Sequence, residues 1–323
     1  MLLDGFGRRV DYLRLSVTDR CDLRCSYCMP EGFKGYEEPR HWLSFDEIER
    51  LLAVFARLGL KHVRLTGGEP LLRKNLPDLA RRLAALPGID DLSLSTNGTQ
   101  LAKHAARLHG AGVTRLNVSL DSLDRERVRA ICRRDALPRV LEGLEVARSE
   151  GFHLIKINMV AIAGTTDEDI CAMVAYCMER GFVLRLIETM PLGETGRGIG
   201  FLNLRPVRER LRQRFGLVDG VVPGGGPARY LVSPDGGFQI GFITPISQHF
   251  CATCNRVRLG VDGVLHLCLG QNDAVDFRTP LRSGCTDAGL EEMLRAALNS
   301  KPWRHEFSER PQQMVRFMSS TGG

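Results

Sequence analysis

This chain of 323 residues shows neither the pattern of a membrane-spanning segment nor that of an export signal. It has no run of eighteen or more apolar residues, so we expect no membrane-spanning helix and no membrane partner. The stretch from Met1 to Gly5 has no apolar core of the kind that an export signal needs. We therefore expect a cytoplasmic protein, and the composition is that of ordinary globular chains.

A strong charge of one sign is also lacking. The 44 Lys and Arg residues exceed the 38 Asp and Glu residues by six. This excess is too small to indicate a nucleic acid partner, although it suits an anionic small molecule. The phosphate-binding loop Gly-x4-Gly-Lys-Ser/Thr is missing as well. If the ligand carries phosphates, cationic side chains must bind them.

Cysteine, in contrast, is plentiful, and three of the ten cysteines lie close together at Cys21, Cys25 and Cys28. In a chain without an export signal, this number points to a reducing compartment and to metal chemistry rather than disulfides. Three thiolates at C-x3-C-x2-C spacing favour a four-iron cluster that keeps one iron open for a small molecule. We expect the four isolated cysteines to be small buried hydrophobic residues, namely Cys132, Cys171, Cys177 and Cys285.

A second cysteine group lies near the C-terminus, where Cys251 and Cys254 form a C-x2-C pair and Cys268 follows after a turn. Spacing alone leaves two interpretations open. One is a small structural zinc site with His266 or His249 as the fourth ligand. The other is a second three-cysteine iron–sulfur cluster.

Strand-like and helix-like patterns alternate six times between residues 12 and 188. This alternation predicts a parallel sheet with helices outside it, and sequence alone does not separate an open sheet from a barrel. The polar candidate residues follow the strands at their C-terminal ends, where such folds keep their chemistry. The expected strands are 12–17, 62–66, 92–95, 115–120, 154–160 and 183–188.

The pattern changes after residue 190. We expect flexible glycine-rich stretches at 191–200 and 224–227, and we place a domain boundary near residue 200. Residues 1–200 would form the α/β domain, and residues 201–323 a smaller α+β region. The expected elements of that region are a helix at 206–215, short strands at 229–232, 238–243, 256–261 and 264–267, and a helix at 290–298.

The first cysteine group resembles the radical S-adenosylmethionine (SAM) enzymes, because Tyr27 precedes the third cysteine and a Gly67-Gly68-Glu69-Pro70 loop follows the second strand. The resemblance implies an incomplete barrel of six β/α units. It also implies a 4Fe-4S cluster whose open iron binds SAM, which is cleaved to methionine and a 5'-deoxyadenosyl radical. The SAM contacts that it implies are Tyr27, Gly68, Ser119 and Met190.

The second cysteine group is similar to that of one branch of these enzymes, the GTP 3',8-cyclases of molybdenum cofactor biosynthesis. The similarity covers nearly the whole chain, from Leu13-Arg14-Leu15-Ser16-Val17-Thr18-Asp19 to the terminal Gly322-Gly323. It implies a second 4Fe-4S cluster, on Cys251, Cys254 and Cys268, that contacts the guanine of GTP. It further implies an electron donor, a downstream pyranopterin-forming enzyme, and a diglycine tail that threads into the active site.

The GTP-binding positions that the same resemblance implies are Arg14, Arg64, Ser95, Lys156, Arg185, Arg256, Val257 and Arg258. Arg256 and Arg258 are two residues apart on an expected strand, so they project to one face, where spacing alone would favour plain solvation. Guanidinium groups suit phosphate, and several cations turned inward are costly without an anion. The rival interpretations are a peptide-modifying radical SAM enzyme and a metal-containing scaffold without turnover. A homodimer is left open.

Overall fold

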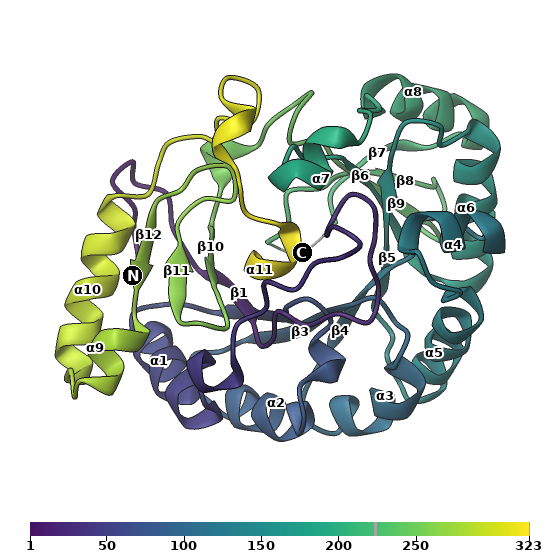
Figure 1. The fold of residues 1–323 in the computed structure, drawn as a ribbon. Coiled ribbons are helices and arrows are strands. Elements are labelled where there is room, and N and C mark those ends of the chain that lie inside the picture. The colour runs from purple at the N-terminus through teal and green to yellow at the C-terminus, as the bar shows by residue number, and fades with distance from the viewer. Residues whose placement is uncertain (223–224, 323) are drawn as a thin grey trace.

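A computed structural model describes residues 1–222 and 225–322. The chain forms one curved sheet with helices on its outer side (Figure 1). The first half contributes the strands β1 (Tyr12–Ser16), β2 (His62–Thr66), β3 (Asp91–Thr96), β4 (Arg115–Ser119), β5 (Ile155–Ala161) and β6 (Val183–Glu188). The second half contributes β7 (Val218–Gly220), β8 (Arg229–Val232), β9 (Gln239–Ile243), β10 (Arg256–Leu259), β11 (Val264–His266) and β12 (Ala274–Asp276).

Helices fill most of the connections. The chain winds through α1 (Phe45–Arg57), α2 (Leu76–Ala84), α3 (Leu101–His109), α4 (Arg125–Cys132), α5 (Leu137–Ser149) and α6 (Asp167–Arg180). It continues through α7 (Gly193–Gly198), α8 (Leu204–Phe215), α9 (Arg278–Arg282), α10 (Asp287–Asn299) and α11 (Met318–Thr321). Short 3-10 turns span Pro39–His41, Pro70–Leu72, Cys251–Thr253 and Pro311–Gln313. No helix in the described ranges is long and apolar enough to span a membrane.

The strand order across the sheet is β12-β11-β10-β1-β2-β3-β4-β5-β6-β9-β8-β7. From β10 to β9 every neighbouring pair is parallel, and the outer strands at both edges are antiparallel. Within the described residues the order does not close on itself. The α/β fold and the incomplete barrel are therefore confirmed.

Two C-terminal strands extend the barrel directly, because β10 pairs with β1 and β9 pairs with β6. The six β/α units thus lie between strands that come from the last third of the chain. The domain division at residue 200 stays a prediction.

The glycine-rich stretch at 191–200 is not an irregular loop, because it contains α7. Glycine is required at Gly193, whose φ is +60° and whose added Cβ would lie 2.7 Å from the ring of Phe317. The strands β7 and β12 were not expected either; each has only three residues, too few for a periodic pattern. The other glycine-rich stretch that the sequence predicts to be flexible is 224–227, and its first residue, Gly224, lies outside the described residues.

Helix α1 shows how the local sequence positions one of these units. The Ser44 side chain accepts a hydrogen bond from Glu47 N, and the Glu47 side chain accepts one from Ser44 N, as the capping-box pattern predicts. Leu51, Leu52 and Phe55 are buried against the sheet. The helix packs beside α10, so a helix from the last third of the chain also covers the outside of the barrel (Figure 1).

Alternation along β1 turns its polar residues toward the barrel interior. Leu13 and Leu15 are fully buried among the helices, and Arg14 between them lines the interior cavity. The sheet register places Arg14 opposite Arg64 of β2 on one side and opposite Arg258 of β10 on the other. The pairing of the strands therefore brings cations from three parts of the sequence side by side in the sheet.

Candidate active site

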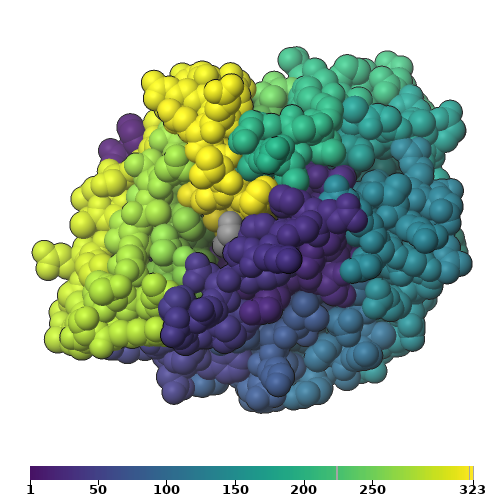
Figure 2. All heavy atoms as spheres, in the orientation of Figure 1, coloured from purple at the N-terminus to yellow at the C-terminus, as the bar shows by residue number. Residues whose placement is uncertain are grey.

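One cavity of about 290 Å³ occupies the barrel interior. All six cysteines of the two groups line it, although the groups are more than two hundred residues apart in sequence. Figure 2 shows that the C-terminal segment, in yellow, and the N-terminal segment, in purple, meet over this face of the molecule. The two predicted centres thus open onto a single space.

The loop that carries Cys21, Cys25 and Cys28 follows β1 and rests on the loop after β2. Gly68 N donates a hydrogen bond to Thr18 O at 2.8 Å. A Cβ on Gly68 would lie 2.3 Å from the carbonyl oxygen of Arg20. Glycine is therefore required here for the approach of two backbone segments, in addition to the expected approach of a ligand.

Burial keeps the thiols of this group protonated in the absence of a metal. It raises the pKa of both Cys21 and Cys28 to about 12. A contact with Cys132, and then burial, also raises the pKa of Cys25. Metal binding would have to displace these protons, and a cluster with positively charged irons provides the driving force. Three thiols around one cavity fit a site-differentiated cluster.

In residues 1–222 and 225–322, no three His, Cys, Asp or Glu side chains converge closely enough to hold one metal ion. A tetrahedral zinc centre requires that convergence. A cubane cluster does not, because each cysteine binds a different iron.

Tyr27 connects this loop to the far side of the barrel. Its hydroxyl donates to Asp121 Oδ2 at 2.8 Å, and Asp121 Oδ1 accepts from Val160 N at 2.8 Å. Burial raises the pKa of Asp121 to about 6. The other expected SAM contacts, Gly68, Ser119 and Met190, line the same cavity. Asp121 was not expected to act on Tyr27, because nothing local in the sequence relates the two.

Cations surround the middle of the cavity. Arg14, Arg64, Arg185, Arg256 and Arg258 line it. Burial and then neighbouring arginines lower the pKa of Arg14 and of Arg258. Among the described residues, no ion pair with a carboxylate is recorded for Arg64, Lys156, Arg185, Arg256 or Arg258. An anionic ligand in the cavity would offset the repulsion among these positive charges.

Arg185 lines the cavity, whereas Lys156, which is buried on the adjacent strand β5, is not among the residues that line it. Arg185 Nε donates to Asn158 Oδ1 at 2.9 Å, and its Nη2 donates to Asn117 Oδ1. Lys156 Nζ lies 6.0 Å from the ring centroid of Tyr230. Burial, followed by repulsion from nearby arginines, lowers the pKa of Lys156 to about 7. The sequence analysis did not predict Asn117 and Asn158 as site residues. A polar amide at an inward-facing position of an otherwise apolar strand could have indicated them.

Ser95 and Val257 complete the expected GTP positions on the cavity wall. The Ser95 hydroxyl is buried and has no hydrogen-bond partner in the described part of the chain. A buried hydroxyl without a partner is costly, so a ligand oxygen would stabilise this position. The Val257 residue is buried, between Arg256 and Arg258 on β10.

The second cysteine group is held by cationic side chains that contact backbone carbonyls. Arg8 Nη1 donates to Cys251 O at 2.8 Å, and Lys301 Nζ donates to Leu267 O at 2.5 Å. Burial raises the pKa of Cys254, but Lys301 and Arg256 outweigh it, so that this pKa lies below its ordinary value. The surroundings of Cys254 thus favour a thiolate, which is the form that binds iron.

The two histidines that a zinc site would use have other partners. His266 Nδ1 accepts from Arg316 Nη1 at 2.7 Å. The His249 ring lies 6.0 Å from that of His305. The Nη2 of Arg316 also donates to the Cys268 carbonyl at 3.3 Å. Arg316 thus fastens the C-terminal segment to the Cys268 loop.

The C-terminal tail reaches the cavity. Arg258 Nη1 donates to Thr321 O at 3.2 Å and also to Gly322 O. Gly322 has a φ of +76°, and a Cβ there would lie 2.3 Å from Thr66 Cγ2. Thr321 is only 1% exposed, so the described tail is packed rather than frayed. Gly323 lies outside the described residues.

Known proteins share both halves of this arrangement. Residues 15–177 match the Radical SAM superfamily, and residues 182–307 match Molybdenum Cofactor Synthesis C. A GTP 3',8-cyclase of Ectopseudomonas mendocina is 47% identical over all of this chain and 98% of its own length. GTP 3',8-cyclase 1 of Pseudomonas aeruginosa is 46% identical over 99% of each chain. The chain belongs to the GTP 3',8-cyclase family.

Solved structures show the same fold at low sequence identity. Streptococcus suis SuiB bound to S-adenosylmethionine is 14% identical, with a TM-score of 0.62 over 89% of this chain and 68% of SuiB. The fold is therefore shared over most of the chain with a protein of very different sequence. The radical SAM membership implies one 4Fe-4S cluster and SAM in this family member.

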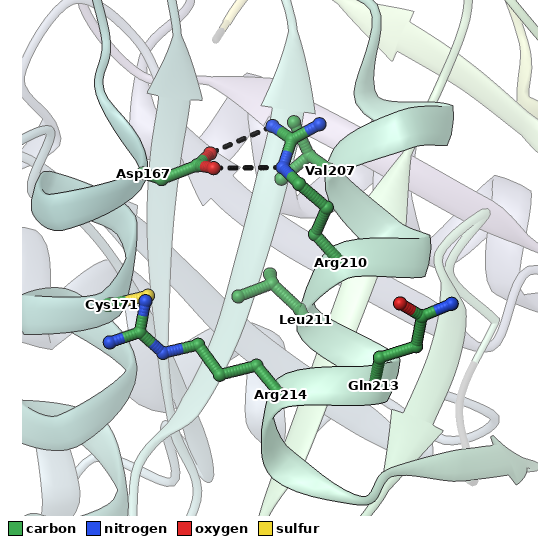
Figure 3. A pocket seen from close by; sticks show the side chains of 7 residues that line it. All are labelled: Asp167, Cys171, Val207, Arg210, Leu211, Gln213 and Arg214. Carbon is green, nitrogen blue, oxygen red and sulfur yellow. Dashed lines mark hydrogen bonds and ion pairs between the residues drawn. The ribbon is translucent and has the colours of Figure 1, made fainter.

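A second hollow of this GTP 3',8-cyclase family member lies between α6 and α8 and has a larger volume, about 420 Å³ (Figure 3). Arg210 is committed there to Asp167, with two contacts of 2.8 Å. Burial raises the pKa of the Cys171 thiol, and Cys171 is the one described cysteine that lines this hollow. This hollow thus offers no set of three cysteines like those that line the central cavity. Cys171 and Cys285 are only half-buried, which corrects the expectation of buried residues; Cys132 and Cys177 are buried as expected.

Replacing Gly193 by alanine is expected to loosen the tail of this family member. The new Cβ would collide with Phe317, and the left-handed backbone costs about 1–2 kcal/mol for a non-glycine residue. Amide hydrogen exchange over residues 315–322 should accelerate about 5- to 30-fold. Gly198→Ala in the same helix, where a Cβ meets nothing within 4 Å, is the matched control. Equal exchange in both variants would show that α7 does not hold the tail.

Proposed function

We propose that this chain is a radical SAM GTP 3',8-cyclase and catalyses the first step of molybdenum cofactor biosynthesis. GTP would be converted to (8S)-3',8-cyclo-7,8-dihydroguanosine 5'-triphosphate, and SAM to methionine and 5'-deoxyadenosine. The observation that carries the proposal is the single cavity onto which both cysteine groups open, with a wall of cations between them. The family membership supports the substrate and the reaction.

Cys21, Cys25 and Cys28 would hold the first cluster. When bound, this cluster and SAM supply the electron and the 5'-deoxyadenosyl radical that removes the 3' hydrogen of GTP. The resulting ribose radical adds to C8 of guanine, and one further electron and one proton complete the product. Tyr27 would tie the cluster loop to Asp121 through its hydroxyl, and Gly68, Ser119 and Met190 would surround the SAM position.

Cys251, Cys254 and Cys268 would hold a second 4Fe-4S cluster that faces the guanine. The cationic surroundings of Cys254 support this role, as does the convergence of all three cysteines on the cavity. Arg8 and Arg316 would set the orientation of the ligand-bearing loops through their contacts with the carbonyls of Cys251 and Cys268.

The triphosphate would lie against the cationic wall, whose members come from β1, β2, β5, β6 and β10. Arginine offers paired donors to phosphate oxygens, so the wall replaces a phosphate-binding loop. Ser95 would donate its buried hydroxyl to the same ligand. The residues with this proposed role are Arg14, Arg64, Ser95, Lys156, Arg185, Arg256, Val257 and Arg258.

The remaining partners are also part of the proposal. The reaction needs an external electron donor, and its product needs a pyranopterin-forming enzyme. We place the protein in the cytoplasm and leave a homodimer open. The diglycine tail, of which Gly322 contacts Arg258, would close the nucleotide end of the cavity.

An anaerobic assay tests the proposed function. The chain is reconstituted with iron and sulfide, supplied with SAM and dithionite, and its 5'-deoxyadenosine yield is compared with and without GTP. Strong stimulation by GTP together with a cyclised guanosine product supports the proposal. Slow SAM cleavage that GTP leaves unchanged would contradict GTP as the substrate. An intact cluster without any SAM cleavage would contradict the enzymatic role.

The affinity for GTP is expected to fall as the pH rises through about 7, which is the pKa of Lys156 in the empty site. Lys156 is protonated below this pH and binds an anion well, whereas above it the neutral amine must first take up a proton. The dissociation constant should rise by up to about tenfold per pH unit above 7. Equilibrium dialysis at several pH values measures the slope.

Lys156→Arg is the matched variant for this titration, because arginine stays charged over the whole range. The variant also corrects for the ionisation of GTP itself, which is identical in both proteins. Its slope should be shallower than that of the unmodified chain. Equal slopes would remove Lys156 from the nucleotide site.

A further inference from the structure

Cys132 lies directly behind the first cysteine group. Its sulfur is 3.7 Å from that of Cys25, and it is 9% exposed. It is the last residue of α4, because Arg133 takes a left-handed conformation with φ of +55° and ends the helix. No other pair of cysteine sulfurs in the described ranges is recorded within hydrogen-bond distance. The function derived above does not use this thiol.

Backbone hydrogen bonds hold the two sulfurs in register. Arg24 N donates to Cys132 O at 3.1 Å, and Ser26 N donates to Ile131 O at 2.9 Å. Cys25 is therefore flanked on both sides by contacts with the end of α4. The backbone thus brings the two residues together, and their side-chain rotamers place the sulfurs 3.7 Å apart.

A disulfide needs a sulfur separation of about 2.05 Å, so the two sulfurs must approach by only about 1.7 Å. The same sulfur of Cys25 cannot bind an iron and Cys132 at once. Cluster binding and this disulfide are thus mutually exclusive states of one residue.

We propose that Cys25 and Cys132 form a disulfide in the chain that lacks its first cluster, by exchange with a small disulfide such as glutathione disulfide. The more exposed Cys25 attacks first and releases one glutathione thiol, and Cys132 then displaces the second. Two protein thiols are oxidised, one glutathione disulfide is reduced to two thiols, and the two protein protons go to the released thiols. The bond withholds one of three cluster ligands and protects Cys25 from irreversible oxidation.

The inference rests on the cluster role of Cys25 and not on GTP as the substrate. Its test uses the full-length chain, freed of iron and incubated anaerobically with glutathione disulfide. After alkylation and tryptic digestion without reductant, mass spectrometry should find peptide 25–34 joined to peptide 130–133 in most chains. Fragment ions, or retention of the link in a Cys28→Ser chain, assign it to Cys25. The anaerobic chain with its clusters in place should show no link.

Iron uptake provides the second measurement. After the same treatment, the unmodified chain should regain its first cluster only once dithiothreitol is added. Cys132→Ser should also need the reductant, but mass spectrometry should find its Cys25 joined to glutathione, because no second thiol displaces it. Cys177→Ser, which changes another buried cysteine, should behave as the unmodified chain and hold no glutathione on Cys25.

The proposal would be overturned by either of two results. One is a chain in which Cys25 is joined to Cys21 or Cys28 or stays free after treatment. The other is a treated Cys132→Ser chain that holds no more glutathione on Cys25 than the unmodified chain does. Neither result would bear on GTP-dependent SAM cleavage, which is measured separately.

Discussion

Cys28→Ser is expected to abolish SAM cleavage and to halve the iron content of the reconstituted chain. The serine hydroxyl is a poor iron ligand, and two thiolates do not hold a site-differentiated cluster. Formation of 5'-deoxyadenosine should fall to the level without enzyme. Iron should drop to about four atoms per chain, because the ligands of the proposed second cluster are untouched. Iron analysis and anaerobic product chromatography measure the two effects.

Cys285→Ser is the matched control for this loss. Cys285 lies between α9 and α10, contacts the carbonyl of Thr286, and does not line the cavity. Its variant should keep both the iron and the cleavage activity. A Cys28→Ser chain with a normal 5'-deoxyadenosine yield would refute the assignment of the first cluster.

Arg258→Ala is expected to have two effects: weaker GTP binding and a loosened C-terminal tail (residues 318–322). Arg258 is 6% exposed, lines the cavity next to Arg14, and donates to the carbonyls of Thr321 and Gly322. A hydrogen bond to a charged group contributes about 1.5–3 kcal/mol, so the dissociation constant should rise about 10- to 150-fold. Amide exchange at residues 318–322 should accelerate in the same protein.

The control for Arg258 is Arg229→Ala, which removes an equal charge from an exposed position on β8. Its dissociation constant for GTP and its tail exchange should stay unchanged. If Arg258→Ala loosened the tail and left GTP binding intact, Arg258 would be a tail anchor and not a nucleotide ligand. If both measurements matched those of the control, neither role would stand.

Local patterns predicted the first half of the fold well. Each of the six early strands is a short apolar run that ends in a turn, and the capping box before α1 specified where that helix begins. Such signals need only the neighbouring residues, so they can be read without knowledge of the rest of the chain. The parallel arrangement followed from the alternation of strand and helix.

The partners of the later strands could not be predicted in this way. Residues 239–243 and 256–259 have similar strand patterns, yet they pair with β6 and β1 at opposite ends of the parallel core. Nothing local distinguishes the two destinations, because the choice depends on which edges remain open after the six units have formed.

The candidate site shows the same limit. Motif spacing named the cysteines, and the family resemblance named the cations that the register then collects around Arg14. Asp121, Asn158 and Arg316 act on other side chains or carbonyls instead of on a motif of their own. Their roles depend on register and on the path of the tail, which the sequence does not state.

The pairing of β10 with β1 has a consequence for how the protein is made. The register joins Tyr12 to Arg256, so β1 leaves the ribosome more than two hundred residues before its partner β10. Contacts of such long sequence separation form slowly. Until then the edge of β1 stays open, and an unpaired edge invites association with other chains. The loop of Cys21 to Cys28 emerges long before the tail of residues 318–322, so it stays uncovered while the intervening chain is made.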